Sequence, residues 1–186
     1  RPCTKLQSSC TNGSATVSGR DSDGNASTWL ASNELHVGSP PNGTGTLLVN
    51  DGALLITQAG AYIGGYPEGV MTVSGRDTVW ENSGDDIRLG YVRTMGTLFI
   101  DNGATVRNAA GAILGRSNSS LRGRTGIVSV SGAGSRWTNQ GSVVVGEGSE
   151  FSDSIEAVGE LTVTDGAYVS SAVGNLGGSN SDIRAY

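Results

Sequence analysis

The stretch GVMTV at residues 69–73 decides the fold, because the chain contains six versions of this five-residue phrase. The other five are GSATV (13–17), GTLLV (45–49), GTLFI (96–100), GIVSV (126–130) and GELTV (159–163). Successive opening glycines lie 32, 24, 27, 30 and 33 residues apart. Self-similarity at such a period is typical of repeat architectures, in which stacked units bury one continuous core.

Each phrase is predicted to be a β-strand with one buried face. Apolar residues alternate within the phrases, as at Met71 and Val73 or at Leu98 and Ile100, and a period of two indicates a half-buried strand. A second short run that ends in glycine follows each phrase: LHVG (35–38), YIGG (62–65), IRLG (87–90), AILG (112–115), VVVG (143–146) and SAVG (171–174). The glycines are expected at corners, where the backbone turns sharply.

One repeat is therefore a strand, a corner, a further strand and a second corner. This order predicts an all-β fold, a right-handed parallel β-helix (solenoid) of about six rungs. The array is expected over residues 13–174, between an N-terminal segment 1–12 and a C-terminal run-off 175–186 of a truncated array. A β-propeller is disfavoured, because three double units, which recur after 56 and 57 residues in the odd phrases, cannot close a ring of typically 4–8 blades.

Composition limits the class of function. The 186 residues include 30 glycines and only 4 prolines, and 16% of them are charged, as expected for a turn-rich β protein with a polar surface. The net charge of −5 argues against a nucleic-acid partner, which needs a basic footprint. No stretch approaches the roughly 18 continuous apolar residues of a membrane helix, so we expect no membrane insertion by this segment.

The phrases GTLxVxxGAxV, xxIG, GxVxVSGxxSxW and LxVG alternate over about residues 13–174. This alternation resembles the strand repeats of autotransporter passenger domains, the secreted β-helical arms of type V secretion systems in Gram-negative bacteria. The resemblance implies export through the periplasm and a location at the bacterial cell surface or outside the cell. It also implies a class that contains many adhesins and autoaggregation factors, but it names no ligand.

Two cysteines, Cys3 and Cys10, lie close together near the N-terminus. A disulfide between them would close a short loop and would suit an oxidising compartment. Half of a metal site and two free thiols are the alternatives. Zinc is not expected, because the chain has no second cysteine pair and its one histidine is distant. We predict a Cys3–Cys10 disulfide, as the implied export through the periplasm also favours.

Other candidate residues are better explained by structure. His36 is the only histidine, so a Ser-His-Asp triad would need it. We expect it instead in one solvent-facing column with Tyr62, Arg88, Ile113, Val144 and Ala172. Trp29, Trp80 and Trp137 occupy matching positions two phrases apart, and packing is favoured over a sugar-binding stripe.

Metal and enzyme sites are not expected. DSDGN (21–25) begins like a calcium loop, but Ala26 and Ser32 stand where an EF-hand needs glycine and glutamate, which favours a surface excursion. The outward strand positions hold no column of acids for the catalytic pair of a polysaccharide-cleaving enzyme. We therefore predict no catalytic residues, no metal and no cofactor.

The binding candidates lie between the repeats. Segments of variable length follow the closing glycines, and they should all leave the β-helix at one corner and line one edge. The two longest, 116–125 and 147–158, are neighbours of opposite charge. Their charged residues are the candidate binding site, which we call the loop edge: Arg116, Arg122 and Arg124 in the first, and Glu147, Glu150, Asp153 and Glu156 in the second. The alternative is two solvated loops that pair with each other.

The leading hypothesis is a bacterial surface or secreted adhesin fragment without enzymatic activity. Its partner would be a host cell-surface or extracellular-matrix component, or a second copy of itself. A structural β-helical stalk that displays a functional region elsewhere is the alternative, and a polysaccharide-cleaving enzyme is the third.

Overall fold

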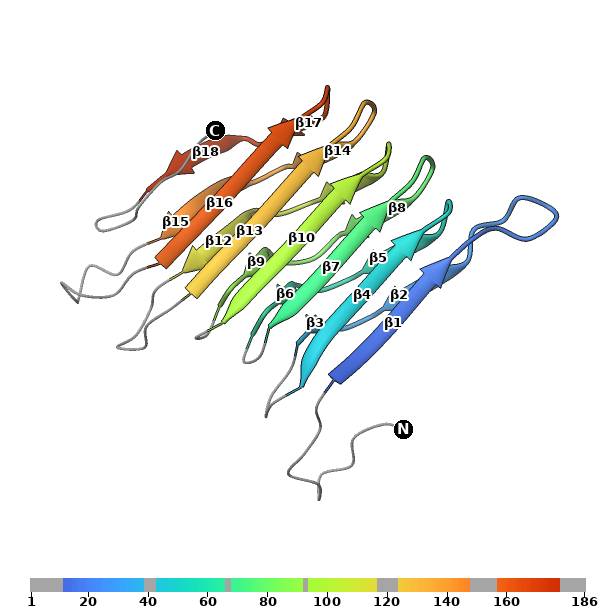
Figure 1. The fold of residues 1–186 in the computed structure, drawn as a ribbon, viewed down its shortest axis with the longest axis horizontal. Helices are drawn as coiled ribbons and strands as arrows, with labels where there is room; N and C mark the ends of the chain where they lie inside the picture. The colour runs from blue at the N-terminus through green and yellow to red at the C-terminus, as the bar shows by residue number, and fades with distance from the viewer. Residues whose placement is uncertain are drawn as a thin grey trace, which may run out of the picture.

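The computed structural model describes residues 12–38, 43–65, 68–91, 94–116, 124–147 and 157–177. These residues form three parallel six-stranded sheets, which wind into a right-handed parallel β-helix (Figure 1). The predicted fold class is confirmed. The described residues include no helix that could cross a membrane.

The first sheet contains the six predicted opening phrases. Its strands are β1 (Asn12–Ser18), β4 (Thr44–Asn50), β7 (Gly69–Ser74), β10 (Met95–Asp101), β13 (Arg124–Ser131) and β16 (Ala157–Thr164). Their opening glycines pair in one unbroken column. From Gly45 onward glycine is required there because the preceding turn passes very close: a Cβ on Gly126 would lie 2.7 Å from the Leu114 carbonyl carbon.

Each turn holds three strands rather than the two that the phrases indicate. The second sheet is formed by β2 (Thr28–Ala31), β5 (Leu54–Thr57), β8 (Val79–Asn82), β11 (Thr105–Asn108), β14 (Arg136–Asn139) and β17 (Tyr168–Ser170). The third sheet contains the closing phrases: β3 (Leu35–Val37), β6 (Ala61–Ile63), β9 (Ile87–Leu89), β12 (Ala112–Arg116), β15 (Ser142–Glu147) and β18 (Val173–Leu176).

The closing phrase of the last turn lies three residues later than predicted. Val144 pairs with Asn175 and not with Ala172, and the corner glycine is Gly177, with a φ of +75°. The physical reason is that this register places Leu176 opposite the inward Val145. The last strand thus runs two residues past the expected end of the array. In the second turn the corner glycine is likewise Gly64, with a φ of +71°, and not Gly65.

Inward side chains of the three sheets fill one core, as the alternation predicts. Met71, Val73 and Ile100 are completely buried. One column of the second sheet alternates a tryptophan with an aliphatic residue, in the order Trp29, Leu55, Trp80, Val106, Trp137 and Val169. Large and small side chains therefore interlock along the axis.

The tryptophans at this column pack rather than bind sugars. Trp80 and Trp137 have no exposed surface, and only Trp29, in the first turn, is 37% exposed. The prediction of packing is confirmed, and the alternative of a sugar-binding stripe is wrong, because a ligand cannot reach rings inside the core.

The corner between the first and second sheets explains why odd and even turns have different sequences and alternate as double units. In even turns it is an Asx-Gly turn with the predicted positive φ, for example +55° at Asp51 and +79° at Gly52. The Gly52 amide donates to Thr78 Oγ1 in the next turn, at 2.9 Å. The Gly103 amide donates in the same way to Ser135 Oγ, at 2.9 Å. A hydroxyl from the corner of the third turn, and one from that of the fifth, thus satisfies an amide of the even corner before it.

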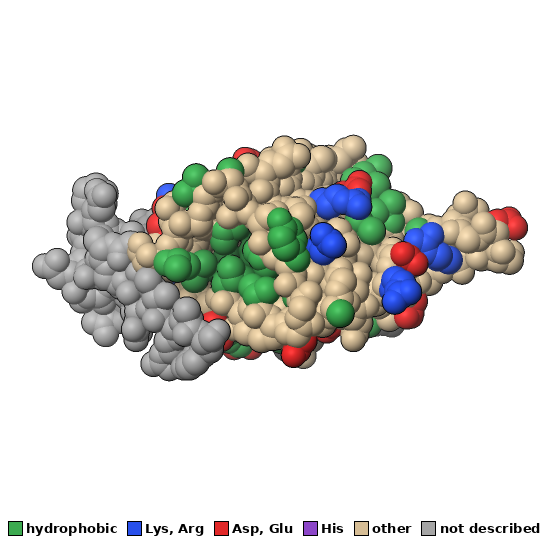
Figure 2. Space-filling model, turned by 90° about the horizontal axis from the view of Figure 1, so that it is seen from above, with side chains coloured by type: hydrophobic (Ala, Val, Ile, Leu, Met, Phe, Trp, Pro, Cys, Tyr) green, Lys and Arg blue, Asp and Glu red, His purple; other side chains and the backbone are tan. Residues whose placement is uncertain are grey.

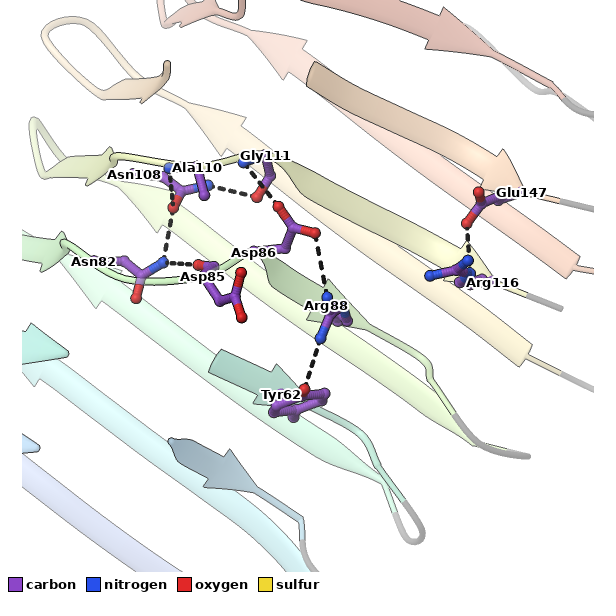
Figure 3. A network of polar contacts seen from close by, with 10 residues as sticks. All are labelled: Tyr62, Asn82, Asp85, Asp86, Arg88, Asn108, Ala110, Gly111, Arg116 and Glu147. Atoms are coloured by element: carbon purple, nitrogen blue, oxygen red, sulfur yellow. Dashed lines mark hydrogen bonds and ion pairs between the residues drawn. The ribbon is translucent and has the colours of Figure 1, made fainter. Parts of the chain in front are cut away.

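A buried ladder of polar side chains follows the corner between the second and third sheets. Thr57 Oγ1 donates to Asn82 Oδ1 at 2.7 Å, Asn82 Nδ2 to Asn108 Oδ1 at 2.7 Å, and Asn108 Nδ2 to Asn139 Oδ1 at 2.9 Å. Asn82 and Asn108 also donate to the carbonyls of Asp85 and Gly111, at 2.6 and 2.7 Å (Figure 3). The ladder fixes the register in which consecutive turns stack.

Charged side chains of both signs lie intermingled on the side of the molecule seen in Figure 2. The hairpin that follows β1 projects from one end of the β-helix (Figures 1 and 2). Apolar side chains gather over the last turn, where Tyr168 is 49% and Leu176 is 62% exposed.

Candidate functional site

The predicted loops share one corner of the β-helix. Each of them joins a strand of the third sheet to the next strand of the first sheet, as between β12 and β13 or between β15 and β16. The turns on both sides of these two segments keep an unbroken register. Insertions at this corner therefore leave the stacking of the core intact.

Only part of the loop edge is described. Arg122, Glu150, Asp153 and Glu156 lie outside the described residues, and so do Cys3 and Cys10, whose predicted disulfide remains a prediction.

Two described residues of the loop edge form an ion pair. Arg116 and Glu147 pair in register on β12 and β15, and Arg116 Nε lies 2.8 Å from Glu147 Oε2 (Figure 3). Their side chains are 37% and 35% exposed. This contact matches the alternative in which the two segments pair with each other, and it still leaves both side chains accessible.

Arg124 differs from the sequence-based expectation of an exposed loop residue. It lies in β13 and is 1% exposed, because it falls on the inward parity of the strand. Its Nη1 donates to the Arg116 carbonyl at 2.6 Å. Arg124 therefore supports the corner from inside, and of the described loop-edge arginines Arg116 is the one with an exposed side chain.

A cluster of polar and aromatic side chains covers the outer face of β3, β6 and β9. Its members, which we call the Tyr62 cluster, are Glu34, His36, Tyr62, Asp86, Arg88 and Tyr91. His36, Tyr62 and Arg88 lie in register, one per turn, and Ile113 and Val144 continue this outward column, as predicted.

The members of the Tyr62 cluster hold one another in place. The His36 and Tyr62 rings are stacked at 5.0 Å between centroids, and His36 Nε2 lies 3.1 Å from Glu34 Oε2. On the other side of Tyr62, Arg88 Nη1 donates to Tyr62 Oη at 2.6 Å (Figure 3). The Tyr91 ring meets Tyr62 edge-on at 5.7 Å.

Arg88 is the centre of this cluster. Its Nη2 lies 3.3 Å from Asp86 Oδ2, while Asp86 Oδ1 accepts the Gly111 amide at 2.9 Å. Burial alone would lower the pKa of Arg88, but its interactions with Tyr62 and Asp86 outweigh burial and raise the pKa above its usual value. The guanidinium is therefore a permanent charge that is fixed in position.

The segment that begins like a calcium loop is a hairpin that satisfies its own acidic residue. Asp21 Oδ1 accepts the amides of Asp23 and Asn25 at 3.0 and 2.8 Å, and Asp21 Oδ2 accepts Asn25 Nδ2 at 2.9 Å. The side-chain hydrogen bond from Asn25, and next its backbone amide, lower the pKa of the exposed Asp21. Among the described residues no group of three His, Cys, Asp or Glu side chains is placed to hold a metal.

The sequence predicted the column of His36, Tyr62 and Arg88, but only as an ordinary row of solvent-facing side chains. It missed Glu34, Asp86 and Tyr91, which lie near these residues in sequence and complete the cluster. Comparisons with protein-family models, with curated proteins and with solved structures find no match to this chain.

Proposed function

We propose that this chain is part of a bacterial surface or secreted adhesin, exported through the periplasm as a β-helical arm like those of autotransporter passengers. It would bind a host cell-surface or extracellular-matrix component, or a second copy of itself, without enzymatic activity. The resemblance of its repeats carries the class of protein, and the β-helix supports it.

One observation carries the proposed site: the two longest segments between turns leave the same corner of consecutive turns without disturbing the register of the core. A surface on which segments can vary in length and charge while the scaffold stays fixed is suited to recognition. At the base of this corner, Arg116 and Glu147 present opposite charges that remain about one-third exposed.

The competing function is a structural stalk. The pairing of Arg116 with Glu147 and the burial of Arg124 favour it, because they use charges that the adhesin would offer to a partner. The ladder from Thr57 to Asn139 would also stiffen such an arm.

Binding of the purified chain separates the two functions. We expect the chain to bind host cells or immobilised matrix proteins, or to self-associate in sedimentation velocity. Exposed ion pairs are worth only about 0–1 kcal/mol each and are screened by salt, so binding through the loop edge should weaken as ionic strength rises. A chain that stays monomeric and binds neither cells nor matrix at low salt would identify a stalk.

A further inference from the structure

We propose that the Tyr62 cluster is a binding site for neutral saccharides. The site lies on the outer face of the third sheet and uses none of the loop-edge residues. It therefore goes beyond the proposed function and can be tested separately from it.

The Tyr62 cluster is organised before any ligand arrives. The His36 ring is stacked on Tyr62 at an interplanar angle of 7°. Arg88 is held between Tyr62 and Asp86, at 2.6 and 3.3 Å, and Asp86 is itself held by the Gly111 amide (Figure 3). Long side chains normally lose rotamer freedom when they bind a ligand. Here most of that loss has already occurred on folding.

The Tyr62 cluster offers both hydrogen-bond donors and hydrogen-bond acceptors. Tyr62 Oη accepts a hydrogen bond from Arg88, so the hydrogen of the phenol is available to an acceptor outside the cluster. The carboxylates of Glu34 and Asp86 are 52% and 29% exposed, and each carboxylate can accept several hydrogen bonds. A saccharide hydroxyl both donates and accepts, and it therefore matches a surface that alternates these groups.

The charges of the Tyr62 cluster favour a neutral ligand. Asp86 pairs with Arg88, the exposed Asp85 is its neighbour in sequence, and Glu34 lies beside His36, so this surface holds three carboxylates and one guanidinium. The net negative charge disfavours sulfated or acidic saccharides, and the central Arg88 opposes a cationic side chain at the same point. A neutral ligand avoids both costs, and its C–H groups can pack against the partly exposed rings of the cluster.

The experiment is an NMR titration with neutral hexasaccharides of glucose, galactose or N-acetylglucosamine. His36 is the only histidine of the chain, so its imidazole signals report on the cluster without ambiguity. We expect a saturable shift of these signals with at least one hexasaccharide, with a Kd on the order of 1 mM or below.

Tyr62→Phe keeps the ring that stacks on His36 and removes only the hydroxyl, and Arg88→Gln removes the charge. Both variants should weaken binding about tenfold, as expected for loss of a hydrogen bond to a charged or buried partner. Arg107→Gln, which breaks an ion pair with Glu81 on the second sheet, is the control and should bind normally.

The proposal is overturned if none of the three hexasaccharides gives a saturable shift, or if Tyr62→Phe and Arg88→Gln bind as well as the parent. A saturable shift with oligolysine alone would also overturn it, in favour of a basic peptide partner. Replacement of Arg116 and Arg122 by serine should leave the saccharide titration unchanged, so failure of this site and failure of the loop edge can be told apart.

Discussion

Removal of the Asn108 side chain should cost much stability for a small change in volume. It is 1% exposed, and its amide makes hydrogen bonds to Asn82, Gly111 and Asn139 at 2.7, 2.7 and 2.9 Å. In Asn108→Ala the buried Asn139 Oδ1 loses its donor, while the Gly111 carbonyl keeps the Ile87 amide and Asn82 Nδ2 keeps the Asp85 carbonyl. The buried group left unsatisfied costs about 1–3 kcal/mol and each of the two other lost hydrogen bonds about 0.5–1.5 kcal/mol, so the total should be about 3–5 kcal/mol.

The matched control is Asn139→Ala, at the end of the same ladder. Asn139 accepts one short hydrogen bond from Asn108, and its own amide donates to the Ser170 carbonyl at a long 3.4 Å. Its removal should cost about 1–2 kcal/mol, because fewer good hydrogen bonds are lost.

Urea and thermal unfolding followed by circular dichroism measure both variants. At about 2–4 °C per kcal/mol for a chain of this size, Asn108→Ala should lower the melting temperature by roughly 10 °C. A cost under about 1 kcal/mol for Asn108→Ala, or a cost no larger than that of Asn139→Ala, would contradict this prediction.

Three further predictions concern the core and the N-terminus. Val73→Asp would bury an unpaired charge in a position with no exposed surface and should cost several kcal/mol. Thr72→Asp, at the outward position before it, should be tolerated. Equal melting temperatures of the two variants would contradict the predicted register. Trp80→Phe should destabilise the chain more than Trp137→Phe by about 1 kcal/mol, because the Trp80 indole donates to Thr57 at 3.1 Å while the buried Trp137 indole has no hydrogen-bond partner among the described residues; the opposite order in urea unfolding would count against this. Mass spectrometry of unreduced protein from an oxidising compartment should find the chain two hydrogens lighter than the dithiol, and two free thiols would disprove the Cys3–Cys10 disulfide.

The fold could be predicted because its signal is local and repeated. Alternation at Met71 and Val73 specifies which face of a strand is buried, and the repeated phrase specifies stacking. The closing phrase of the last turn was placed incorrectly because two overlapping runs, SAVG (171–174) and GNLG (174–177), both end in glycine. Only pairing with β15 distinguishes them.

Asn82, Asn108 and Asn139 recur in the sequence, but they lie outside the repeated phrases from which the fold was predicted. Each of these asparagines stands two or three residues before a glycine, but their alignment depends on the middle strand of each turn, which is only four residues long. The position of Arg124 was not predicted either. Its charge indicated an exposed loop, whereas its position in β13 turns it inward.

Binding by a loop-edge variant is the decisive test of the proposed site. Arg116→Ser combined with Arg122→Ser removes the two candidate arginines and retains the buried Arg124, so the core should stay folded. Arg107→Ser combined with Arg136→Ser makes the same change of charge on the second sheet and is the control. If the loop edge is the site, cell or matrix binding, or self-association, should fall sharply in the first variant and persist in the control. Equal binding by the parent and both variants would contradict this assignment.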